Sequence, residues 1–311
     1  MLSRVAYSLY WMSRYMERSD GILRLLRVNY AYSQDDFNQF SWKPVLSIFS
    51  AMKPAEKIKI QYQNRTVLKF MITDNENQNS VLNLICTARE NARSVQDNVT
   101  KELWQCLNDY YHEIRKKQIG VSLELDDPIS VIDNLVTQGL QYYGTYEITM
   151  ARSEGYYFMN IGKYIERAIL SVDILDVKFS ELEYSLDETT DPTYWKYFLL
   201  SISGYELFLK SYRSALDSSN VLHQIVWNDD FPRSIIYSVN RIQKSFETLK
   251  SDKTSESYKV LSFMIGQLES SIRYSDLKDL QQVGLKEYLQ KIKNDLFAIA
   301  DALNHYYFAF N

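Results

Sequence analysis

Apolar residues recur at helical spacing along the start of the chain. Steps of three and four from Leu2 to Tyr30 pass nine positions, of which eight are apolar and one is Ser19. This spacing predicts one long amphipathic helix. Further apolar residues, such as Trp11 and Leu25, lie off the stripe. A helix that is apolar on more than one face is normally buried, so we expect this one to be central in a helical bundle.

Three charged residues lie inside this apolar segment. Arg14 and Arg18 share one face of the predicted helix, and Glu17 lies one turn from Arg14. An unpaired ion in a protein interior is very unfavourable. We therefore expect these side chains to be at least half buried, and to be either paired inside the protein or placed to meet a ligand.

The charged segment has a counterpart in the second half of the chain. Residues 14–28 align without gaps on residues 163–177, and two further blocks follow in the same order at a similar offset. The aligned charged pairs are Arg14/Lys163, Glu17/Glu166 and Arg18/Arg167. Three blocks in one order indicate an internal repeat. The sequence therefore predicts an all-α protein, a large helical bundle built from two tandem pseudo-symmetric repeats, approximately 1–147 and 148–311, within a single domain 1–311.

The remaining segments also predict helices. A turn capped by Ser, or by a preceding Asn or Asp, leads into a helix at both Ser80 and Ser234. Residues 56–73 contain short runs in which β-branched residues alternate with others, a pattern typical of a strand. No other segment is predicted to be a strand that could pair with this one, so we expect a helix or an irregular link. Long helices are predicted for 79–118 with a break near Asn98, for the segment after Asp127, for 256–274 and for 285–310.

Composition supports long helices joined by short loops. Only nine Gly and five Pro occur among 311 residues, which leaves few tight turns and disfavours β-sandwiches and barrels. The 25 Tyr and 14 Phe can fill helix interfaces where each hydroxyl reaches a partner or water.

Charge and cysteine content restrict the class of protein. A net charge of −4 and a pI near 5.6 argue against a nucleic-acid partner, because such proteins are normally basic. Cys86 and Cys106 form no CxxC motif, which fits a reduced cytosolic setting. No stretch approaches the ~18 apolar residues of a membrane-spanning helix. We therefore expect a soluble, cytoplasmic protein that binds neither nucleic acid nor membrane.

Motifs of common catalytic and cofactor sites are missing from the sequence. There is no GxGxxG, P-loop, GxSxG or HExxH motif. The only histidines are His112, His223 and His305, and none has the ExxH spacing of di-iron bundles. We therefore expect no metal and no cofactor, and the sequence identifies no catalytic residue.

Two groups of charged residues remain as candidate sites. The Arg/Lys-Tyr-x-Glu-Arg element occurs twice, and it can be interpreted as internal salt bridges or as a polar pocket whose arginines face an anionic ligand. Arg89 and Arg93 share a face of another predicted helix, where they form either a specialised site or the partners of Glu17. The candidate ligand-binding residues are therefore Arg14, Glu17, Arg18, Arg89, Arg93, Lys163, Glu166 and Arg167.

Four segments resemble the bacterial alpha-E domain family, an all-helical domain with a Glu-Arg motif. These segments are 1–26, 88–95, 161–179 and 231–239, and the motif corresponds to Glu17-Arg18 and Glu166-Arg167. The resemblance spans essentially the whole chain. Lys163 stands where the pattern would place an arginine, and the turn at 77–80 lacks the proline of the turn at 231–234. These departures argue against identical binding by the two halves.

The resemblance implies partners and a broad role, but no catalytic residue. Members of that family are encoded beside, or fused to, a circularly permuted ATP-grasp protein and a transglutaminase-like protein. This context implies a role in making or processing peptide or amide bonds. We therefore expect a non-catalytic or substrate-handling helical partner of an ATP-grasp peptide or amide ligase, with buried arginines available to bind a carboxylate-bearing peptide substrate.

Two alternative functions use the same residues. An enzyme that forms or transfers amide bonds would use Glu17, Arg89 and Arg93, but a carboxylate flanked by arginines has a depressed pKa and is a poor general acid. A pure protein-interaction scaffold would instead engage Arg89 and Arg93 fully in pairs with internal carboxylates. The sequence decides neither the ligand nor the oligomeric state.

Overall fold

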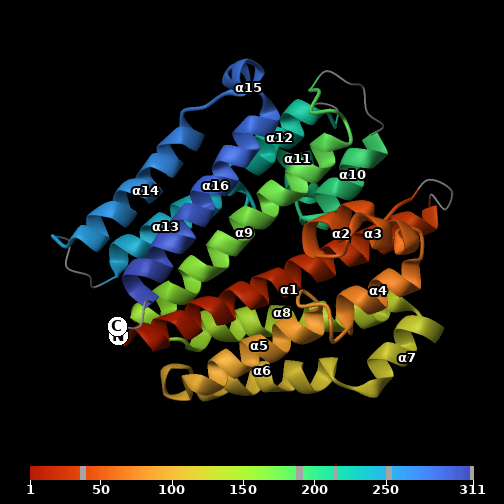
Figure 1. Cartoon of the computed structure of the whole chain (residues 1–311), viewed down its shortest axis with the longest axis horizontal. Coiled ribbons are helices and arrows are strands. Elements are labelled where there is room, and N and C mark those ends of the chain that lie inside the picture. Colours follow the sequence, from red (N-terminus) through yellow and green to blue (C-terminus); the bar gives the residue numbers. More distant parts are fainter. Residues whose placement is uncertain (36–39, 187–191, 213–215, 250–253, 309–311) are drawn as a thin grey trace. The chain divides into compact units, whose positions relative to one another are not determined.

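The protein is all-helical in the computed structural model, which describes residues 1–35, 40–186, 192–212, 216–249 and 254–308. Every regular element in these ranges is a helix, which confirms the predicted fold class (Figure 1). None of the helices in these ranges combines the length and the apolar content needed to cross a membrane. The helices form two compact units. The larger unit comprises Met1–Arg14 and Arg152–Asn311, and the smaller unit comprises Tyr15–Ala151.

The two units do not coincide with the two predicted repeats. The first helix, α1 (Ser3–Asp35), contributes its residues up to Arg14 to the larger unit and its remainder to the smaller unit. The other boundary follows Ala151, just after α8 (Pro128–Thr149). The pseudo-symmetric repeat therefore stays a prediction.

The α1 helix is buried on more than one face. Leu9, Met12 and Leu26, which belong to the predicted apolar stripe, are fully buried. Ile22 lies off this stripe and is fully buried as well. These positions confirm the prediction that α1 is an interior helix rather than one with a single buried side.

Helices of one to six turns follow α1 in the smaller unit. There, α6 (Lys101–Ile114) packs against both α5 (Val81–Ser94) and α8. The segment 56–73 is mostly helical, with a turn at 61–63. The predicted break near Asn98 is confirmed, but the helix predicted for 79–118 is interrupted a second time, at Arg115 and Lys116. The other elements of this unit are α2 (Lys43–Phe49), α3 (Pro54–Ile60), α4 (Asn64–Ile72), the 3-10 helix η1 (Gln96–Asn98) and α7 (Lys117–Leu125).

In the larger unit, α9 (Glu154–Ser180) is the central helix. It packs against α13 (Ile235–Thr248) and α16 (Leu285–Leu303), and α14 (Glu256–Arg273) packs on both of these. Residues 309 and 310 of the predicted C-terminal helix lie outside the described ranges. The other elements of this unit are α10 (Pro192–Ser201), α11 (Tyr205–Ser211), α12 (Ser218–Val226), α15 (Leu277–Val283) and a π-helical turn, η2 (Asn304–Phe308).

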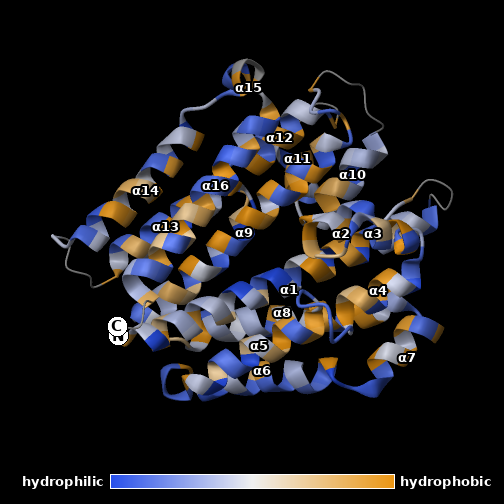
Figure 2. Ribbon diagram, in the orientation of Figure 1, coloured by the Kyte–Doolittle hydropathy of each residue, from blue (hydrophilic) through white to orange (hydrophobic). Residues whose placement is uncertain are grey.

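The outer helices of the larger unit are buried on one side. Four residues of α14 that recur every three or four positions are buried, namely Leu261, Ile265, Leu268 and Ile272. Figure 2 shows the corresponding alternation of apolar and polar bands along α14 and α16. Such helices gain most of their stability from packing of the apolar stripe rather than from intrinsic propensity.

Capping residues fix where several helices begin. The Oγ atom of Ser80 accepts a hydrogen bond from the N–H of Asn83 at 3.2 Å, and Ser234 accepts one from Tyr237 at 3.0 Å. Asp127 caps α8 in the same way, with a proline in the first turn. Since a capping oxygen satisfies an otherwise unpaired N–H of the first turn, these contacts explain and confirm the predicted helix starts.

A close approach between α1 and α9 occurs at Gly162. A Cβ atom at this position would lie 2.3 Å from the backbone oxygen of Tyr10, far inside van der Waals contact. Tyr10 is itself fully buried, so this part of α1 has little room to move away. Glycine is therefore required here by the spacing of the two helices.

We expect Gly162→Ala to lower the free energy of unfolding by about 3 kcal/mol, because the added methyl group must displace a helix backbone. Gly144 is the matched control, since it is exposed in α8 and no atom lies within 4 Å of its Cβ position. Alanine there should stabilise the protein by up to about 1 kcal/mol through helix propensity. Urea unfolding followed by circular dichroism measures both effects, and equal effects would contradict the close contact.

Candidate functional site

A buried ion pair joins α1 and α9. The Nε atom of Arg14 lies 2.8 Å from Oε2 of Glu166, and the two residues are only 5% and 4% exposed. The Nη1 atom of Arg14 also donates to the hydroxyl of Tyr10 at 3.2 Å. The guanidinium centre lies 4.7 Å from the ring centre of Trp11 and 5.6 Å from that of Tyr10. The charge is thus enclosed by a carboxylate and two aromatic rings.

The surroundings of Arg14 keep it protonated. Burial alone would lower the pKa of its guanidinium, but the charge of Glu166 and hydrogen bonds to Glu166 and Tyr10 raise that pKa above its ordinary value. Burial also raises the pKa of the Tyr10 hydroxyl, which therefore stays neutral. Arg14 is a permanently charged group held by internal partners, which suits a structural pair and not a proton donor.

The arginine of each Glu-Arg element holds a turn in its own unit. In the smaller unit, Nη1 of Arg18 donates to Oδ1 of Asn79 at 3.0 Å, in the turn before α5. In the larger unit, Nη1 of Arg167 donates to the backbone oxygen of Pro232 at 3.1 Å, in the turn before α13. Both arginines therefore stabilise a turn that leads into a Ser-capped helix.

The sequence did not reveal this role of the two arginines. Part of the signal was present, because a Glu-Arg element precedes a Ser-capped turn in both halves of the chain. The separation between the partners, 61 residues for Arg18 and 65 for Arg167, is too long for helical spacing to reveal the contact.

The glutamates of the two elements are buried as well. Glu17 is fully buried and accepts a hydrogen bond of 2.6 Å from the hydroxyl of Tyr143 on α8. Glu166 is engaged by Arg14 on α1. Each carboxylate is therefore held by a side chain of another helix. The contact of Glu166 is a salt bridge, as the structural interpretation of these elements requires, whereas that of Glu17 with Tyr143 is a hydrogen bond from a hydroxyl group.

Lys163 and Arg167 share an aromatic neighbour in the larger unit. Lys163 is 8% exposed, and its Nζ atom lies 4.5 Å from the ring centre of Tyr164. The guanidinium of Arg167 lies 5.2 Å from the same ring. An aromatic face attracts a cation, and more strongly where water is excluded, so this ring helps to hold both positive charges.

Arg89 and Arg93 pair with a carboxylate of their own helix. Nη1 of Arg89 lies 3.0 Å from Oε1 of Glu90, and Nη2 of Arg93 lies 2.6 Å from Oε2 of the same residue. Arg89 also donates from Nε to Oδ1 of Asn108 at 2.8 Å. The interpretation that these arginines are the partners of Glu17 is therefore wrong. Glu90 is one residue from Arg89 and three from Arg93, so it can reach both without any tertiary contact.

Three surface cavities, of about 360, 460 and 730 Å³, lie apart from these contacts. None of the eight candidate residues lines any of the three. No sequence motif marked these cavities, because residues from separate helices and turns line each of them. In the part of the chain that the structure describes, no three or more His, Cys, Asp or Glu side chains are grouped so that they could hold a metal ion.

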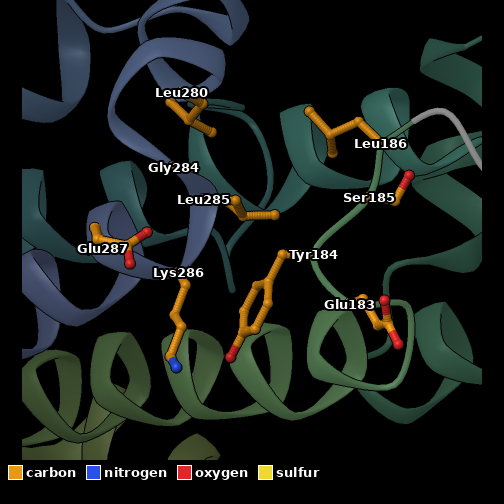
Figure 3. A pocket seen from close by; sticks show the side chains of 9 residues that line it. All are labelled: Glu183, Tyr184, Ser185, Leu186, Leu280, Gly284, Leu285, Lys286 and Glu287. Atoms are coloured by element: carbon orange, nitrogen blue, oxygen red, sulfur yellow. The ribbon is translucent and has the colours of Figure 1, made fainter.

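The cavity of about 460 Å³ lies in the larger unit, between the end of α9 and the junction of α15 with α16 (Figure 3). Tyr184 donates from its hydroxyl to Oδ1 of Asp176 at 2.8 Å, and burial together with this carboxylate raises the pKa of Tyr184 to about 12. Figure 3 shows Lys286 extending beside the ring, with Glu183 and Glu287 to either side. A neutral phenol, an ammonium and two carboxylates can bind a polar ligand, but they supply no activated nucleophile.

We expect Arg14→Met and Glu166→Leu each to lower the free energy of unfolding by about 3–5 kcal/mol, since each leaves a buried partner uncompensated. The double variant should lose less than the sum of the two, because no unpaired charge remains inside. Urea unfolding of the wild type and the three variants measures this coupling. Strictly additive losses would show that the two side chains do not interact.

Arg18→Met and Arg167→Met should each destabilise the protein by about 1–2 kcal/mol, because each change leaves a turn acceptor without its charged donor. Amide hydrogen exchange should increase locally, in the first turn of α5 for Arg18 and of α13 for Arg167. Arg93→Met is the control, since Arg93 is 64% exposed and its surface pair contributes little. Exchange that rises in the same regions for all three variants would contradict these assignments.

Comparison with known proteins relates the chain to a described family. The model of the Alpha-E family, described as a predicted alpha-helical domain with a conserved ER motif, matches residues 1–308. Uncharacterized proteins of Mycobacterium bovis and Mycobacterium tuberculosis are 22% identical to the chain over 334 residues. The match covers 96% of this chain and 36% of each relative, so the chain spans about a third of the length of these relatives. No solved structure matches the chain.

Proposed function

The chain belongs to the Alpha-E family, and on this premise we propose that it is a non-catalytic or substrate-handling helical partner of an ATP-grasp peptide or amide ligase. In this proposal a circularly permuted ATP-grasp protein supplies the acyl-phosphate chemistry, and a transglutaminase-like protein is a further partner. The contribution of this chain is a helical surface on which the partner docks and beside which a substrate is held.

The observation that carries the proposal is the extent of the match to the relatives. Nearly the whole chain aligns with 36% of each relative, so in those proteins the homologous region is joined to a much longer polypeptide. Joining two domains in one chain raises their effective concentration to about the millimolar range, which favours domains that act together. We therefore expect this chain to associate with other domains of the same system.

The contacts of the Glu-Arg elements support a role for them in holding the fold. Glu17 and Glu166 are buried and engaged by Tyr143 and Arg14. A substrate carboxylate that competed for Arg14 would deprive the buried Glu166 of its guanidinium partner, at a cost of about 3–5 kcal/mol. In this proposal, substrate handling therefore falls to surface residues and not to the buried arginines.

A pure interaction scaffold is the second candidate function. It requires Arg89 and Arg93 to be fully engaged by internal carboxylates. Both pair with Glu90, but Glu90 is 49% exposed, so this surface pairing meets the requirement only in part. An enzyme that forms or transfers amide bonds would need the same arginines beside Glu17, which the pairing with Glu90 does not support.

We also propose that the protein acts in the cytoplasm. Cys86 and Cys106 are free thiols, which suits a reducing compartment. An ATP-dependent partner would likewise require a compartment that contains ATP.

Co-purification tests the proposed partnership. We expect the untagged chain to co-elute in a fixed ratio with the tagged circularly permuted ATP-grasp protein of the same genome, and to change its rate of ATP hydrolysis when peptide is present. An unrelated helical protein of similar size and charge is the control. Co-elution without any change in rate would favour the scaffold, and failure of both would refute the partnership.

A further inference from the structure

The cavity of about 360 Å³ in the smaller unit has an unusual charge distribution. It lies between α5, the segment that precedes α5, and the junction of α6 with α7. Of the nine residues that line it, three are cationic and none is acidic. The cations are Arg115, Lys116 and Lys117, and Leu82 and Ile114 add an apolar wall.

The three consecutive cations are only partly neutralised. Arg115 donates from Nη1 to the hydroxyl of Tyr111, which carries no charge. Lys116 has its Nζ atom 2.5 Å from Oε2 of Glu113. Lys117 is exposed and forms no ion pair with any residue in the described ranges. The junction therefore presents more positive than negative charge to the cavity.

Two guanidinium groups act on the cavity wall at Cys86. Burial raises the pKa of the Cys86 thiol and the charge of Glu90 adds to this rise, whereas the charges of Arg115 and Arg89 oppose it. Both arginines also lie over the ring of Tyr111, with guanidinium centres 5.1 and 4.4 Å from its centre. The ring holds these charges in place, so the positive potential does not depend on flexible lysines alone.

The two other cavities combine both signs of charge. The cavity of about 730 Å³ shares Thr73 and Asn75 with this one, but carboxylates line it beside its cations, and Lys69 pairs with Glu124 there. The cavity of Figure 3 is lined by two carboxylates and one lysine. Of the three, the cavity of about 360 Å³ alone has a lining with cations and no carboxylate.

We propose that this cavity binds a small oxyanion, namely the phosphate or carboxylate group of a soluble ligand. A concave surface of one charge focuses the electrostatic potential and concentrates counter-ions. Lys and Arg side chains then bind the oxygens through charge-assisted hydrogen bonds. If residues 115–117 were only a solvated helix end, they would show no affinity for any particular anion. The site uses none of the Glu-Arg residues and does not depend on the ATP-grasp partnership.

Gly120 leaves space for such a ligand. It lies within α7 and lines the cavity, and no atom lies within 4 Å of the position that a Cβ would take. Glycine inside a helix is about 1 kcal/mol less favourable than alanine, so helix formation itself does not explain its presence. A longer side chain at this position would take up cavity space.

Cys86 is a reporter inside the cavity, and Cys106 is an internal reference. Burial raises the pKa of both thiols and a nearby carboxylate adds to the rise at each, Glu90 at Cys86 and Asp109 at Cys106, but two arginines oppose the rise at Cys86 only. An anion in the cavity should protect Cys86 from neutral iodoacetamide and leave Cys106 unaffected. Mass spectrometry measures the alkylation of the two cysteines in one sample.

Two anions distinguish the sources of the oxyanion. The two probes are inorganic pyrophosphate and N-acetyl-dialanine, each at millimolar concentration, with chloride added to keep the ionic strength constant. We expect at least one of them to slow the alkylation of Cys86 by about threefold relative to that of Cys106. Protection by pyrophosphate alone identifies a phosphate ligand, and protection by the dipeptide alone identifies a carboxylate ligand. Unchanged relative rates with both anions would overturn the proposal.

Variants locate the binding site. Gly120→Glu places a carboxylate at the cavity and should abolish the protection, whereas Gly266→Glu in α14, where space around the Cβ position is equally open, should retain it. Lys117→Gln changes only an exposed side chain and should weaken the protection of Cys86. This second variant keeps the test valid if Gly120→Glu does not fold. Circular dichroism checks that each variant is folded. Full protection in the folded cavity variants would overturn the proposal.

Discussion

The ion pair between Arg14 and Glu166 is the constraint on which the packing of α1 against α9 depends. Both residues are almost completely buried, so each charge offsets much of the cost of burying the other. The pair favours one relative register of the two helices, since a shift of one turn would separate the two buried ions. Gly162 reinforces this register, because the backbone of Tyr10 occupies the space that a side chain would need. Electrostatics and steric fit thus specify the same arrangement.

The arginines of the Glu-Arg elements fix turns in the same way that the ion pair fixes the long helices. Arg18 and Arg167 each stabilise the turn that leads into a Ser-capped helix, so the start of α5 and the start of α13 are tied to α1 and α9, respectively. A helix whose first turn is capped and whose preceding turn is held has few alternative positions. The residues that look most like a binding site in the sequence therefore have internal partners.

In the proposed function, partner and ligand binding therefore lie on surfaces that the Glu-Arg elements support. The relatives are much longer than this chain, which favours a domain that works with other domains rather than alone. The cationic cavity beside Cys86 is one place where such a domain can contribute chemistry of its own, because carboxylates neutralise its positive charge only in part. A core fixed by a buried ion pair and an accessible charged cavity are complementary requirements for a protein that positions a ligand for a partner.

The sequence by itself determined the helices, because helical hydrogen bonds and caps act within about four residues. The apolar stripe of α1, the caps at Ser80 and Ser234 and the family were readable for this reason. The choice of partner for each charge was not, since Arg14 and Glu166 lie 152 residues apart and spacing along a helix offers only local candidates. The cavity near Cys86 also joins side chains from several segments. Only tertiary packing decides which of these distant groups meet, because it depends on the fit of whole helices.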